Sequence, residues 1–195
     1  MKTLLISAAA TVAALAPSQA LAQAVPGAVI AVVDLERVTS QCNACKTATT
    51  ALQGQVNSLK SRQQALATPL ETEGKSIQAA VNALNGKAPD AALQARIKAF
   101  QAKQDQGRQE LVRRQEQVQR NQAYIQQQIA SKLGPIYQQV MQRRGANIML
   151  EVGATLASGT SVDVTNDVLA ALNTALPTIQ VNAPAQTQPA KPQGR

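Results

Sequence analysis

The sequence contains no histidine, only two cysteines and few aromatic residues. Without histidine, no Ser–His or Cys–His pair can form a nucleophilic active site. The two cysteines also lack the partners that would complete a four-ligand zinc site. Gly107, Gly145 and Gly153 do not have the spacing of a phosphate-binding loop. We therefore expect no cofactor, no metal ion and no enzymatic activity.

Long hydrophobic runs are also missing. The longest, Leu4 to Ala16, has about 13 residues, which is shorter than the roughly 20 that a membrane-spanning helix needs. It follows the basic start at Lys2 and precedes Ala20-Leu21-Ala22, a small-residue cleavage site, so we predict a signal peptide over residues 1–22. Cys42 lies too far beyond this site for a lipoprotein. We expect a soluble, exported mature chain that begins at Gln23.

Acidic residues are few, with 11 Asp and Glu against 19 Lys and Arg, and the formal net charge is +8. Such a balance favours acidic partners: unfolded acidic chains, anionic lipid head groups or nucleic acid. Export argues against nucleic acid. The alternative is that the charge only keeps an elongated protein soluble.

Two long helical segments dominate the sequence pattern. From about Ser40 to Leu84, and again from about Asp90 to Arg143, apolar residues recur at steps of three and four, as in a coiled coil. Because only about six residues separate the segments, the helices must be antiparallel neighbours. We predict a hairpin arm over residues 40–143 with its tip at about 85–90. Pro69 predicts a kink or break near Thr68.

Short β-rich segments flank the arm. Residues 28–33 form a continuous apolar run and residues 147–152 a second strand, and Thr165 is a candidate N-cap for a helix over residues 166–176. We predict a base built from residues 23–39 and 144–177, followed by a disordered Pro/Gln-rich tail over residues 178–195. Two or three short strands cannot form a stable core alone. We therefore expect self-association through Ile30, Val32, Ile148, Leu150 and Val152.

The expected fold is α+β and mostly α, and the order of its elements is specific. Besides the hairpin, the chain contains Ile30-Ala31-Val32-Val33-Asp34, Ile136-Tyr137-Gln138-Gln139-Val140, the strand Ile148 to Val152 and Asp163-Val164-Thr165-Asn166-Asp167-Val168-Leu169. On these segments, between about residues 28 and 174, the chain resembles the Skp/OmpH-like periplasmic chaperones. It implies a periplasmic, prefoldin-like "jellyfish" homotrimer whose arms surround a cavity. Unfolded outer-membrane β-barrel proteins would be held there without ATP.

Three features depart from the family pattern. These are the cysteines, the long tail, and Leu156 and Ala157 where the family has an aromatic residue in the last strand. Cys42 and Cys45 form a C-x-x-C pair at the strand-to-helix junction. A local or intersubunit disulfide is the favoured interpretation. Thiol redox catalysis and two unpaired thiols are the alternatives.

Basic residues on the arm are candidate contacts for acidic clients or for an anionic lipid surface. They are Lys75, Lys87, Arg108, Arg113, Arg114 and Arg120. An ordinary solvated helical face is the alternative for each of them. The carboxylates Glu71, Glu73, Glu110 and Glu116 lie near basic neighbours, where surface ion pairs are the default.

Three hypotheses of function follow. The first is an ATP-independent holdase for unfolded outer-membrane proteins, the second a structural coiled-coil adaptor of the cell envelope, and the third a thiol oxidoreductase acting through Cys42 and Cys45. Pro69 and the polar residues within the apolar seam favour the holdase, because a rigid spacer would gain from an uninterrupted seam. These polar residues include Gln63, Gln104 and Asn121.

Overall fold

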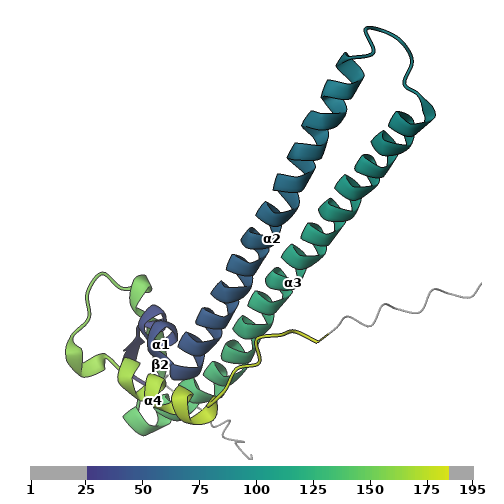
Figure 1. Cartoon of the computed structure of the whole chain (residues 1–195). Coiled ribbons are helices and arrows are strands. Elements are labelled where there is room, and N and C mark those ends of the chain that lie inside the picture. Colours follow the sequence, from purple (N-terminus) through teal and green to yellow (C-terminus); the bar gives the residue numbers. More distant parts are fainter. Residues whose placement is uncertain (1–25, 185–195) are drawn as a thin grey trace, which may run out of the picture.

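A computed structural model describes residues 26–184. Two long antiparallel helices form an arm that projects from a small base (Figure 1). The helices are α2 (Asn43–Asn82) and α3 (Ala91–Arg144). The base holds β1 (Ile30–Val33), α1 (Leu35–Gln41), β2 (Ile148–Glu151), the 3-10 turns η1 (Val152–Ala154) and η2 (Thr160–Val162), and α4 (Thr165–Ala175). The predicted mostly helical fold with a hairpin on a small β-strand base is confirmed. The predicted signal peptide lies outside the described residues.

The ends of α3 follow from its sequence. The Asp90 side chain accepts a hydrogen bond from the Leu93 main-chain N–H at 2.8 Å and satisfies a donor that the first turn leaves free. At the other end Gly145 takes a left-handed conformation with φ of 66°, directly after Arg143 and Arg144. The two cations lie at the negative end of the helix dipole. At the arm tip, Asn85 and Gly86 also have positive φ, which turns the chain back.

The helix α2 runs through Pro69 without interruption, so the predicted break near Thr68 is wrong. Pro69 is exposed, so water can satisfy the carbonyl group that a mid-helix proline leaves without a donor. The helix α3 likewise contains Pro135. The residue before it is Gly134, which has no Cβ to clash with the proline ring.

The base is a two-stranded parallel sheet packed on helices. Ile30 pairs with Ile148, and the register continues to Val33 and Glu151. Ala31 and Val33 point into the core. There they join residues from α1, α3 and α4, of which Val38, Val140, Val168 and Leu172 are fully buried. The core therefore joins residues 31–45 and 164–176 to the end of α3 that lies at the base.

Two features of the base differ from the sequence-based expectation. The helix α1 follows β1 directly, whereas we expected helical structure only from about Ser40. Such a short helix depends on tertiary packing, here through the fully buried Val38. The Thr165 hydroxyl does not cap its own helix, because it accepts a hydrogen bond from the Asp34 N–H at 2.9 Å. Thr165 therefore joins the start of α4 to the end of β1.

The tail is ordered further than we predicted. We expected disorder from residue 178, but residues 178–184 lie along the lower part of α3 (Figure 1). Side-chain amides of the arm bind the main chain of this segment, which composition alone does not reveal. Residues 185–195 lie outside the described residues.

Candidate functional surfaces

An apolar surface lies open at the base. Ile30, Ile148 and Val152 are 42%, 40% and 38% exposed, and Leu150 is partly exposed. We call these four residues the base patch. Ile30 and Ile148 are register partners, so their side chains lie next to each other on the face of the sheet opposite Ala31 and Val33. The fifth residue predicted for self-association, Val32, is buried within its own chain and offers little surface to a partner.

The sheet is also open at one edge. β1 has β2 on one side and a bridge from Val32 to Asp163 on the other. Among residues 26–184, β2 pairs with β1 alone. A free strand edge beside exposed apolar side chains is a template for association with another chain.

The six predicted basic residues are spread over the arm and do not form one cluster. Lys87 is exposed in the loop at the tip. Four others form ion pairs: Lys75 with Glu71 at 2.7 Å, Arg108 with Asp105 at 2.7 Å, Arg114 with Glu110 at 2.8 Å and Arg120 with Glu116 at 3.8 Å. Arg113 is exposed and has no carboxylate partner within the described part of the chain. Arg113 and Lys87 are therefore the cations most available to a partner.

Glu110 is the centre of an ionic contact between the two arm helices. Its carboxylate receives two hydrogen bonds from Arg62 of α2, at 3.0 and 2.8 Å, and one from Arg114 at 2.8 Å. Hydrogen bonds from Arg62, then from Arg114, hold the pKa of Glu110 at about 2, and the same contact raises the pKa of Arg62. Nearby, Lys103 of α3 binds Glu73 of α2 at 2.8 Å. Arg62 and Lys103 were not among the residues singled out from sequence, because cross-helix register is not readable from either helix alone.

An open groove runs between α2 and α3 in this region. A cavity of about 520 Å³ is lined by residues that include Arg62, Leu66, Lys103, Gly107 and Glu110. A second cavity of about 200 Å³ lies next to it toward the base, and its lining includes Gln55, Arg114, Asn121 and Asn182. Gly107 lines the larger cavity opposite Leu66, where an added Cβ would lie at ordinary contact distance, 3.7 Å, from Leu66 Cδ1. We call the two cavities together the arm groove.

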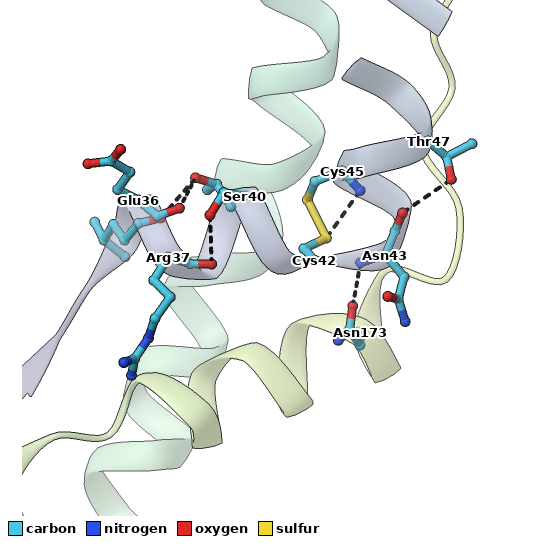
Figure 2. The surroundings of a disulfide bond; sticks show 10 residues. Glu36, Arg37, Ser40, Cys42, Asn43, Cys45, Thr47 and Asn173 are labelled. Carbon is cyan, nitrogen blue, oxygen red and sulfur yellow. Dashed lines mark hydrogen bonds between the residues drawn. A yellow bond between two sulfur atoms is a disulfide. The ribbon is translucent and has the colours of Figure 1, made fainter. Parts of the chain in front are cut away.

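The two cysteines form a disulfide where α1 ends and α2 begins (Figure 2). Cys42 is 0% and Cys45 3% exposed. The Cys42 sulfur accepts a hydrogen bond from the Cys45 N–H at 3.2 Å, and the neighbouring Asn43 N–H donates to Asn173 Oδ1 of α4 at 2.9 Å. Thiol–disulfide exchange requires access to sulfur. This buried position therefore favours a structural role over redox catalysis.

Neither a membrane span nor a metal site is found in the described part of the chain. No helix between residues 26 and 184 has the length and hydropathy needed to cross a bilayer. Over the same residues, no three His, Cys, Asp or Glu side chains gather in a way that could hold a metal ion.

The described residues therefore form an α+β protein in which a long helical hairpin projects from a base with two parallel strands. Comparison with known families gives a match over residues 29–172 to the outer membrane proteins described as OmpH-like. The chain belongs to this family, which confirms the resemblance to the Skp/OmpH-like chaperones and makes the protein a member of a non-enzymatic family of the cell envelope.

A solved structure has the same fold. It is that of an OmpH-like protein from Caulobacter crescentus CB15, described as a candidate outer membrane chaperone. The two chains align with a TM-score of 0.67 at 19% sequence identity, over 85% of this chain and 96% of the other. No curated protein matches the sequence.

Proposed function

We propose that the protein is an ATP-independent periplasmic holdase that binds unfolded outer-membrane β-barrel proteins and keeps them from aggregating before insertion. Residues 1–22 direct its export as a cleavable signal peptide. The observation that carries the proposal is an arm that projects from the base (Figure 1) and has an open, charged groove between the middle parts of its two helices. A rigid spacer would close this groove with apolar side chains.

The proposed assembly is a homotrimer that associates through the base patch and the free edge of β2. Association removes the exposed side chains of Ile30 and Ile148 from water and leaves the arms side by side around a shared space. Three chains would also triple the positive charge around that space. The charge attracts unfolded acidic segments over a distance of about a Debye length.

Client binding in such a space needs no fuel. Many weak apolar and ionic contacts hold an unfolded chain, and the client leaves when folding in the membrane is more favourable. Exposed Lys87 at the tip of the arm can contact an anionic lipid surface, where release would occur. No step in this cycle uses nucleotide hydrolysis.

The test is to dilute a urea-unfolded outer-membrane β-barrel protein into buffer with and without the mature chain, residues 23–195. Light scattering follows aggregation, and multi-angle scattering gives the mass of the protein. Because the chain contains no tryptophan, tryptophan fluorescence reports on the client alone. We expect suppressed aggregation by a species of about three chains. No suppression at a severalfold excess would instead support a structural adaptor that binds folded envelope partners.

A further inference from the structure

Residues 179–184 pack on the arm as an extended chain. Ile179, Val181 and Ala183 are partly buried, and the residues between them are exposed. Burial with a period of two is the signature of an extended segment with one face against a surface. The segment runs from the end of α4 toward the tip, beside α3 (Figure 1).

The arm holds this segment mainly by its main chain. The Gln128 side chain accepts a hydrogen bond from the Gln180 N–H at 2.9 Å and donates one to the Gln180 carbonyl oxygen at 2.8 Å. Further along, Asn121 Oδ1 accepts the Ala183 N–H at 2.9 Å. These three bonds do not depend on the tail sequence, whereas two others, from Gln55 Nε2 at 3.0 Å and Asn121 Nδ2 at 3.4 Å, hold the Asn182 side chain.

The spacing of the two amides matches the rise of a nearly extended chain. Asn121 and Gln128 are seven residues apart on α3, which is two turns or about 10.5 Å. Gln180 and Ala183 are three residues apart, and three extended residues span about 10 Å. In a regular extended chain the N–H groups of residues i and i+3 point to opposite sides, but the bend at Asn182 lets the N–H groups of Gln180 and Ala183 meet both side-chain amides.

The Asn121 side chain is buried at this site and is held there by hydrogen bonds. It is 1% exposed, its Nδ2 donates to Gln55 Oε1 at 2.7 Å, and its Oδ1 accepts from Gln117 at 2.7 Å. These bonds orient the amide so that Oδ1 also faces the tail main chain. A buried and fully satisfied polar group of this kind fixes one geometry.

The arm groove continues from the docked tail toward the tip. Asn182 lines the smaller cavity, and the larger one follows. Four cations line the two cavities against two carboxylates: Arg62, Lys103, Arg113, Arg114, Glu73 and Glu110. Residues 185–195 carry Lys191 and Arg195 and no acidic residue, so they do not complement this charge. An acidic extended segment of another polypeptide does.

We propose that the arm groove binds an extended segment of the unfolded client through main-chain hydrogen bonds, and that residues 178–184 compete for its basal end. This inference rests on the proposed holdase function. The tail then keeps the amides of Gln128 and Asn121 satisfied in the empty protein. Because the client must displace the tail, the apparent affinity for the client equals the intrinsic affinity multiplied by the fraction of time that the tail is undocked.

The test compares tail variants of the mature chain by titrating a tryptophan-containing, urea-unfolded β-barrel protein. Gln180→Pro removes the N–H that binds Gln128, and Gln180→Ala is its matched control because it keeps the main chain. Deletion of residues 180–195 removes the competing segment, and deletion of residues 185–195 is the control. Ile179 is retained throughout because it packs against the core.

We expect Gln180→Pro and the longer deletion to bind the client about threefold or more tightly, with both controls unchanged. Within the longer deletion, Gln128→Ala should weaken client binding by about threefold, whereas the neighbouring Gln127→Ala should not. Hydrogen exchange at the Gln180 and Ala183 amides should accelerate when client binds the intact chain.

Client binding by every variant without tightening on deletion would overturn the competing role of the tail and leave the holdase function in place. Equal effects of Gln128→Ala and Gln127→Ala would overturn main-chain binding of the client at the site that the tail occupies. If neither the intact chain nor any variant binds the client, the holdase function fails, and the client is not the occupant of the groove.

Discussion

Glu110 shows how a single side chain joins the two helices of the arm. It lies on α3 but receives two of its three hydrogen bonds from Arg62 of α2. The contact is solvent-exposed, so its contribution to stability is screened by salt. Its geometry still sets the register of the helices beside the arm groove.

We predict that Glu110→Gln lowers the melting temperature at pH 7 and that the difference from the unmodified protein disappears in acid. The folded-state pKa of Glu110, about 2, lies below its ordinary value of 4.5. The ion pairs therefore contribute fully above about pH 4.5, and the contribution is lost as the pH falls toward 2. Thermal unfolding at pH 7, 4 and 2 measures this. Glu116→Gln, which breaks one 3.8 Å contact, is the control, and an equal loss for both variants would contradict the prediction.

Cys42 closes a disulfide over three positions of the chain, at the point where the arm leaves the base. We predict that Cys42→Ser destabilises the protein by about 2 kcal/mol, the value for closing so short a loop. Holding of an unfolded client should remain, because the disulfide is buried away from the arm groove. Urea unfolding with and without reductant checks the stability, and the unmodified protein under reductant should match the variant. Loss of client holding in Cys42→Ser would revive the thiol oxidoreductase hypothesis.

The ends of the arm helix α3 are set by capping residues close in sequence. Asp90 caps the start of α3 and Gly145 ends it in a left-handed turn. Both are local signals, because capping depends on residues within one turn of the helix end. The continuity of α2 through Pro69 was not readable, because it depends on whether that face of the helix is exposed.

We predict opposite effects from two glycine-to-alanine changes in the arm. At Gly145, with φ of 66°, alanine should destabilise the protein by about 1–2 kcal/mol. At Gly54, inside α2, alanine should stabilise it by about 0.5–1 kcal/mol. A Cβ at either position meets no atom within 4 Å, so the difference isolates backbone conformation. Urea unfolding of both variants is the measurement. Destabilisation by Gly54→Ala would show that steric contacts, and not backbone conformation, determine the effect of the substitution on stability.

At the scale of the whole molecule, the base of the single chain exposes apolar side chains. The face of the two-stranded sheet that carries Ile30 and Ile148 is not covered by the helices of the base. In the proposed trimer, association at the base patch would also fix where each arm starts, because the core residues of the base come from both end parts of the described chain.

If the proposed trimer forms through the base patch, we predict that Ile148→Asp shifts the mass from about three chains to one, since an aspartate in an apolar interface would have to be buried without a partner. Val112→Asp is the matched control, because Val112 is similarly exposed, at 49%, but lies on the arm. Multi-angle light scattering gives the mass, and circular dichroism checks that the helices remain. A variant Ile148→Asp with unchanged mass would move the interface away from the base patch.

By itself, the sequence determined the elements whose signals are local: the two arm helices, their caps, the tip and the strands at either end. Heptad spacing and capping act over a few residues, so they are visible in one segment at a time. Only the tertiary structure decided which residues meet across segments. Arg62 reaches Glu110, Thr165 binds the end of β1, and Gln128 holds residues 178–184. These contacts depend on the register between distant parts of the chain, which no local pattern encodes.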